Sequence, residues 1–125
     1  MRVLVVDPSA VMRSMLIRTL QRSGLPLVAI AQAQGGLAAL DLLGREAFDL
    51  VLVDHTLPDM SAAELVEAIM AQPAWSRVAW VVIGGDADTL PARGVGGISL
   101  PKPFTPDDVR SAVLASLAAG EPGAP

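Results

Sequence analysis

Leu50-Val51-Leu52-Val53-Asp54 is a short apolar run that ends in an aspartate, and Val3-Leu4-Val5-Val6-Asp7 repeats the pattern near the N-terminus. Uniformly apolar, β-branched runs of this length are typical of strands buried on both faces, as in a parallel sheet. Each aspartate stands where such a strand runs out into a loop. The two stretches therefore predict two buried strands with a carboxylate at the end of each.

Strand-like and helix-like patterns alternate along the rest of the chain. The predicted strands are residues 3–6, 27–31, 50–53, 78–83 and 98–100. Helices are predicted after Ser9, at residues 36–45, from Ser61 to Ala71, and from Thr105 to about Ala119. Alternation with short connections indicates an α/β fold with right-handed crossovers.

Helix starts are marked by capping residues. Ser9 is a predicted N-cap, Ser61 and Glu64 form a predicted capping box, and Thr105 precedes a proline at the first helical position. The first helix is expected to stop near Gly24. In the second helix the apolar residues that recur on one face are Leu37, Leu40 and Leu43.

These elements predict a flavodoxin-like, doubly wound, five-stranded parallel sheet in the order 2-1-3-4-5. The fourth helix, between residues 86 and 97, is expected to be short because the segment contains Pro91 and three glycines. The chain is interpreted as one domain over residues 1–119, with a disordered Gly- and Pro-rich tail at 120–125.

Composition excludes several classes of function. A formal net charge of −4 argues against nucleic-acid binding, and the absence of cysteine excludes disulfides and thiolate chemistry. Asp7 interrupts the first apolar stretch too early for a signal peptide, and no run approaches a membrane span. We expect a cytoplasmic domain that binds neither nucleic acid nor membrane.

Lys102 is the only lysine beside eight arginines, and it lies in Leu100-Pro101-Lys102-Pro103-Phe104. A single ammonium kept in an arginine-rich chain indicates a site that needs a point charge on a flexible stem. Ligands of doubly wound sheets bind beyond the carboxyl ends of the strands. Asp7 and Asp54 are predicted there, with Lys102 reaching over from the fifth strand.

Three motifs follow one another along the chain: Val3–Asp7 with Ser9–Arg13, Asp54–Met60, and Lys102–Phe104. Together they resemble the receiver domains of bacterial response regulators, particularly the chemotaxis (CheY-like) type. The resemblance covers the chain to Ala119 and implies a two-component phosphorelay signalling domain, not an enzyme. It implies that Asp54 is the phosphoacceptor and Lys102 the partner of the phosphoryl group. It further implies a cis Lys102–Pro103 bond.

The resemblance also implies a Mg²⁺ site formed by Asp7, Asp54 and Thr56. Receivers usually carry a second acid after the first strand, and here that position is Pro8. Mg²⁺ binding is therefore expected to be weak, with Lys102 paired directly to Asp54 in the resting state.

Two further departures concern transmission of the signal. In receivers a Ser or Thr hydroxyl usually moves to bind the phosphoryl group, and this position aligns with Gly84. A buried aromatic side chain on the fifth strand usually moves inward after it, and this position aligns with Ser99. We expect a backbone N–H near Gly84 or Gly85 to donate to a phosphoryl group in place of the missing hydroxyl. The sole histidine, His55, is interpreted as a loop residue beside the site.

Three function classes stay open. The first is a phosphorylatable receiver served by a histidine kinase or phosphotransfer protein, with a downstream protein target and a possible homodimer. The second is a pseudo-receiver that binds partners independently of phosphorylation. The third, a flavin- or nucleotide-binding domain, lacks a glycine-rich turn, since Asp7-Pro8-Ser9 follows the first strand. Taken alone, Asp54 and Lys102 are also consistent with a strand-end carboxylate and a solvated lysine.

Overall fold

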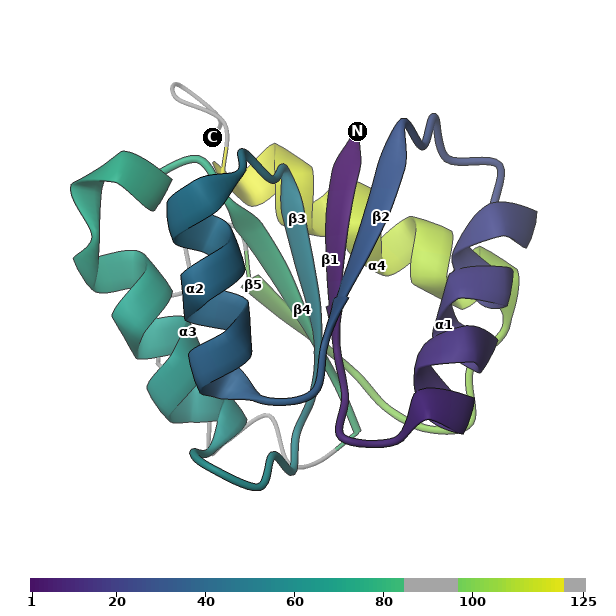
Figure 1. Cartoon of the computed structure of the whole chain (residues 1–125). Coiled ribbons are helices and arrows are strands. Elements are labelled where there is room, and N and C mark those ends of the chain that lie inside the picture. Colours follow the sequence, from purple (N-terminus) through teal and green to yellow (C-terminus); the bar gives the residue numbers. More distant parts are fainter. Residues whose placement is uncertain (85–96, 121–125) are drawn as a thin grey trace.

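The computed structural model describes residues 1–84 and 97–120 of the chain as an α/β fold (Figure 1). Its first half contains, in order, β1 (Arg2–Val6), α1 (Ala10–Arg22), β2 (Ala29–Ala33), α2 (Gly36–Arg45) and β3 (Leu50–Asp54). Its second half contains α3 (Ala62–Ala71), the short 3-10 helix η1 (Pro73–Trp75), β4 (Ala79–Ile83), β5 (Gly97–Leu100) and α4 (Pro106–Gly120).

The described strands form one parallel sheet in the order β2-β1-β3-β4-β5. The register pairs Val6 of β1 with Val53 of β3, and Asp54 of β3 with Ile83 of β4. Because the strands are parallel, their carboxyl ends meet at one edge of the sheet. The residues that follow β1, β3 and β5 therefore converge there.

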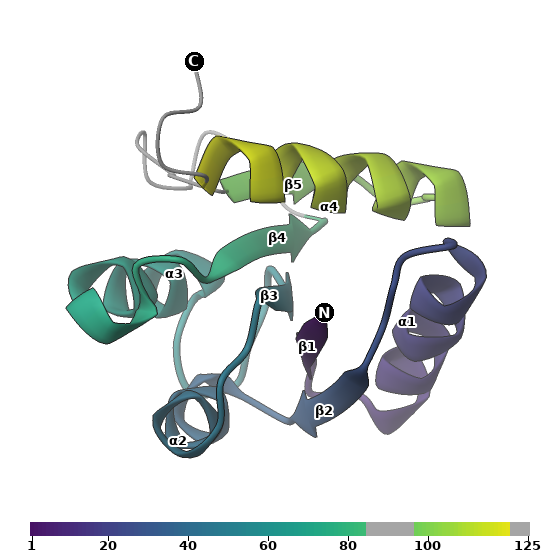
Figure 2. The same cartoon turned by 90° about the horizontal axis from the view of Figure 1, so that it is seen from above.

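Helices cover both faces of the sheet, α2 and α3 on one side and α1 and α4 on the other (Figure 2). Alternate strand residues point to opposite faces, so the core has two halves. Leu4, Val51 and Leu65 lie in the half under α2 and α3. Leu16, Leu52 and Val113 lie in the half under α1 and α4. Every residue of β3 is buried, as its apolar run predicts.

The helix starts follow the capping residues. Ser9 Oγ accepts the backbone N–H of Met12 at 3.3 Å, and Ser61 and Glu64 form the predicted capping box. Thr105 Oγ1 accepts the backbone N–H of Asp108 at 3.1 Å. Helix α1 ends at Arg22, and Gly24 follows with a φ of +80°, a conformation that glycine adopts without steric cost.

Two local predictions were wrong. The second strand begins at Ala29 rather than at residue 27. The backbone N–H of Val28 donates a hydrogen bond to Met1 O, and the strand pairing with β1 starts only at Ala29. As an edge strand, β2 does not need an apolar run, so composition located it poorly. Leu37 is 65% exposed, since the buried face of α2 consists of Gly36, Ala39 and Leu43.

The predicted short helix at 86–97 lies almost entirely outside the described residues, as does nearly all of the predicted tail. Helix α4 includes Gly120, one residue beyond its predicted end. Within residues 1–84 and 97–120, no helix is long and apolar enough to cross a membrane.

Candidate functional site

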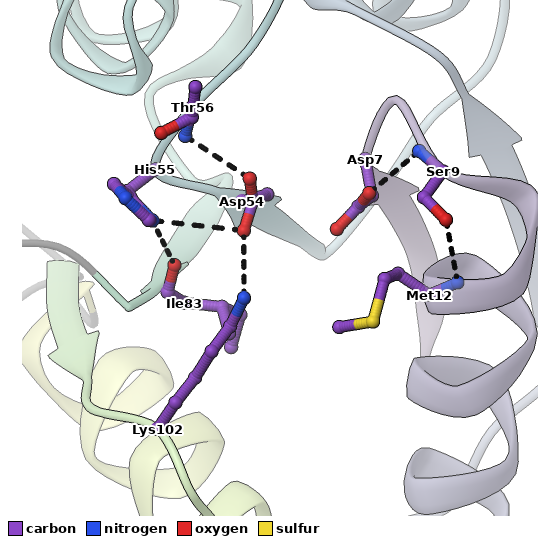
Figure 3. A network of polar contacts seen from close by, with 8 residues as sticks. All are labelled: Asp7, Ser9, Met12, Asp54, His55, Thr56, Ile83 and Lys102. Atoms are coloured by element: carbon purple, nitrogen blue, oxygen red, sulfur yellow. Dashed lines mark hydrogen bonds and ion pairs between the residues drawn. The ribbon is translucent and has the colours of Figure 1, made fainter.

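Asp7, Asp54 and Lys102 meet at the carboxyl edge of the sheet (Figure 3). Asp7 directly follows β1, and Asp54 ends the neighbouring strand β3. Nζ of Lys102 lies 3.3 Å from Oδ1 of Asp54, so the predicted resting pair is present. The peptide bond between Lys102 and Pro103 is cis, as expected. The structure therefore brings together the three charges that the sequence singled out.

Asp7 is 3% exposed, and its Oδ1 accepts the backbone N–H of Ser9 at 2.8 Å. Burial raises the pKa of this carboxyl, and the negative charge of Asp54 adds to the rise. The Ser9 hydrogen bond and the positive charges of Lys102 and Arg13 act in the opposite direction. Burial is the largest of these effects, so the carboxyl of Asp7 is harder to ionise than a solvated aspartate.

The carboxylate of Asp54 has a different contact at each oxygen. Oδ2 accepts the backbone N–H of Thr56 at 3.2 Å, while Oδ1 faces Lys102. Nδ1 of His55 lies 3.8 Å from the same Oδ1. These contacts fix the orientation of a carboxylate that is only 8% exposed at the residue level.

Gly84, at the carboxyl end of β4, differs from what the sequence suggested. Its backbone N–H donates to Leu100 O at 2.8 Å, so this group is already engaged and is not a spare donor for a phosphoryl group. Its φ is +74°, and a Cβ built there would lie 2.9 Å from Nδ1 of His55. The predictions for Gly85 and for the Ser99 side chain fall outside the described part of the structure.

The loop between β3 and α3 is held at several points. Thr56 and Ser61 form an antiparallel bridge, and the Leu57 side chain is buried. The carboxylate of Asp59 accepts the backbone N–H groups of Gly36 and Leu37, each at 2.9 Å. Sequence reasoning missed the role of Asp59. The available signal was a helix that starts after Gly35, which has no side chain to cap it.

The donor set suits a hard, oxygen-seeking cation but is sparse. Asp7 and Asp54 supply two carboxylates, and the proline at position 8 supplies no side-chain oxygen. No cluster of three or more His, Cys, Asp or Glu side chains able to hold a metal ion occurs among the described residues. Mg²⁺ can bind through one or two carboxylates with waters completing its octahedron, so the residues present fit a weakly held ion.

Comparison with known proteins agrees with this geometry. Residues 3–114 match the response regulator receiver domain family. The Chemotaxis protein CheY homolog of Campylobacter jejuni is 31% identical, over 96% of this chain and 95% of that protein. The sporulation initiation phosphotransferase F of Bacillus subtilis is 30% identical, over 90% of each chain.

A solved structure has the same fold over nearly the whole chain. The chemotaxis response regulator CheY4 of Vibrio cholerae superposes with a TM-score of 0.75 at 26% identity, over 93% of this chain and 98% of that one. The family match over residues 3–114 includes Asp7, Asp54 and Lys102. The chain therefore belongs to the response regulator receiver domain family and is a CheY-like receiver of two-component signalling.

Proposed function

We propose that Asp54 accepts a phosphoryl group and that the chain works as a phosphorylatable receiver. The observation that carries the proposal is the 3.3 Å contact between Lys102 Nζ and Asp54 Oδ1, beside the buried carboxylate of Asp7. A carboxylate held at a strand end next to an ammonium is a nucleophile with a ready counter-charge for an incoming phosphoryl group.

The reaction is an in-line displacement at phosphorus. A carboxylate oxygen of Asp54 forms a bond to phosphorus, and the bond from phosphorus to the donor breaks, with its electron pair leaving on the donor atom. The donor is a phosphohistidine of a histidine kinase or phosphotransfer protein, or a small phosphodonor. Lys102 balances the charge of the phosphoryl oxygens in the transition state. Water later hydrolyses the acyl phosphate.

Asp7, Asp54 and Thr56 are the residues that would hold Mg²⁺. When bound, the ion supplies charge neutralisation for phosphoryl transfer. The residues themselves orient the nucleophile: the Thr56 N–H holds Oδ2 of Asp54, and the Ser9 N–H holds Oδ1 of Asp7. With Pro8 in place of an acid, the affinity for the ion is expected to be low.

In this role the chain is cytoplasmic, receives its phosphoryl group from a protein partner, and acts on a downstream protein target rather than as an enzyme on a separate substrate. One matched relative is named a phosphotransferase and another a chemotaxis protein, which supports a phosphorelay role.

A second candidate is a pseudo-receiver that binds partners without phosphorylation. Gly84 favours it, because this residue has no hydroxyl and its N–H is bonded to Leu100 O. A ligand shifts an equilibrium only through contacts that differ between two states. Without a donor at Gly84, phosphorylation of Asp54 is expected to be transmitted poorly through this residue.

The test is transfer of labelled phosphoryl from acetyl phosphate to purified protein at high Mg²⁺. We expect acid-stable, base-labile label on the wild type, none on Asp54→Asn, and unchanged label on Asp41→Asn, an exposed carboxylate on α2. Lys102→Ala should slow the labelling strongly. Absence of label from a folded wild type, tested also with a histidine kinase, would leave the pseudo-receiver as the function.

A further inference from the structure

His55 lies between the proposed phosphoacceptor and the end of β4. Its backbone N–H donates to Ile83 O at 3.1 Å, and Nδ1 of its ring lies 3.3 Å from the same oxygen. Since a carbonyl oxygen only accepts, Nδ1 is the donor in this second contact. The ring thus presents an N–H close to Oδ1 of Asp54, which is 3.8 Å from Nδ1 (Figure 3).

The ring also fills the space beside Gly84. A Cβ at this glycine would lie 2.9 Å from Nδ1 and 3.3 Å from Cε1 of His55, and 3.5 Å from Cε of Lys102. The imidazole and the lysine stem together cover the backbone at a position that has no side chain. Both side chains also lie at Oδ1 of Asp54, Lys102 with Nζ at 3.3 Å and His55 with Nδ1 at 3.8 Å.

We propose that His55 binds the phosphoryl group on Asp54 through its Nδ1–H and thereby links the phosphorylated carboxylate to the end of β4. The inference rests on the proposed function of Asp54. A phosphoryl group on Asp54 adds strong acceptor oxygens beside the Nδ1–H, which in this structure donates to Ile83 O. The ring can turn its N–H from Ile83 O to one of them.

This exchange leaves no orphaned group. Ile83 O keeps the backbone N–H of His55 when the ring turns away, so the carbonyl stays satisfied. His55 therefore makes a contact that exists in one state and not in the other, which is the requirement for a phosphorylation-dependent change. The side chain is 44% exposed, so it has room to rotate.

The first experiment measures the initial rate of labelling from acetyl phosphate in three variants. His55→Phe keeps a ring but has no N–H donor, and His55→Ala removes both the ring and the donor. His55→Gln restores an N–H donor. Because the transition state carries charge on its phosphoryl oxygens, losing one hydrogen bond should slow labelling about three- to tenfold in His55→Phe and His55→Ala. His55→Gln should recover most of the rate, which a purely space-filling role would not produce.

The second experiment follows the ring itself. His55 is the only histidine, so its ring ¹⁵N signals in an NMR spectrum need no assignment by mutation. Addition of beryllofluoride, a phosphoryl mimic, should shift the Nδ1 signal in the wild type and leave it unchanged in Asp54→Asn. An unshifted ring in a protein that binds the mimic overturns the inference.

The outcomes separate the two proposals. No label on the wild type removes the proposed function and the inference with it. If the wild type is labelled and all three His55 variants are labelled at the wild-type rate, the inference is wrong but the proposed function stands. Thermal unfolding of each variant checks that a changed rate does not come from a lost fold.

Discussion

Oδ1 of Asp59, in the loop after β3, accepts the backbone N–H of Gly36 at the first residue of α2. Oδ2 accepts the next N–H, that of Leu37. A Cβ at Gly35 would lie 2.8 Å from Oδ1, so a residue with a side chain there would displace the carboxylate. The loop that follows Asp54 thus caps a helix that lacks a capping side chain of its own.

Removing the carboxylate of Asp59 should lower stability in a pH-dependent way. The N–H groups of Leu37 and Gly36 hold the pKa of Asp59 below its ordinary value of 3.8. A carboxyl with a lowered folded pKa stabilises the protein fully above 3.8 and loses that contribution as the pH falls through the folded pKa. Asp59→Ala should therefore be less stable than the wild type at pH 7 in urea unfolding, with a smaller difference at acid pH.

Asp41→Ala is the matched control for this measurement. Asp41 is an exposed carboxylate on α2, the helix that Asp59 caps, and it forms a surface ion pair with Arg45 at 3.2 Å. Its removal should change stability little. Amide exchange of Gly36 and Leu37 should accelerate in Asp59→Ala and stay unchanged in Asp41→Ala; the reverse pattern would contradict the cap.

The two helical glycines of α2 should respond oppositely to alanine. A Cβ at Gly36 would overlap Sδ of Met60, whereas a Cβ at Gly44 meets nothing within 4 Å. Gly44→Ala should raise the free energy of unfolding by about 0.5–1 kcal/mol through helix propensity alone. Gly36→Ala should lower it despite the same propensity gain. Urea unfolding measures both, and adding Met60→Ala should recover part of the loss at Gly36.

Truncation in the central strand should be costly. Leu52 is 0% exposed and packs in the half of the core under α1 and α4. Leu52→Ala should lower the free energy of unfolding by about 2–5 kcal/mol, the range for a buried leucine that leaves a cavity. Val11→Ala, at a residue that is 78% exposed, should change it by less than about 0.5 kcal/mol. Comparable losses at both residues would contradict the packing described here.

Restoring an acid next to Asp7 should strengthen Mg²⁺ binding. Pro8 is exposed at the edge where Asp7 and Asp54 meet, so Pro8→Asp adds an oxygen ligand and a negative charge there. Calorimetric titration should show a dissociation constant about tenfold lower than that of the wild type. Pro26→Asp, which adds the same charge at an exposed proline between α1 and β2, should not change it. Equal affinity in wild type and Pro8→Asp would show that position 8 does not face the ion.

Much of the fold was predictable because its signals are local. The apolar runs of β1 and β3, the capping residues Ser9, Ser61 and Thr105, and Gly24 after α1 each specify structure within a few residues. The edge strand β2 was misplaced because its boundaries depend on pairing with β1. Leu37 was misplaced because the burial of a helix face depends on what packs against it.

The sequence by itself determined where β1, β3 and β5 end and therefore which acids and which lysine come to one edge of the sheet, since parallel strands align their carboxyl ends. Only the tertiary structure decided how the side chains meet there: the bond of Gly84 N–H to Leu100 O, the ring of His55 over Gly84, and the carboxylate of Asp59 on α2. These contacts join segments 16 to 29 residues apart along the chain, and a local pattern carries no information about which distant groups will meet.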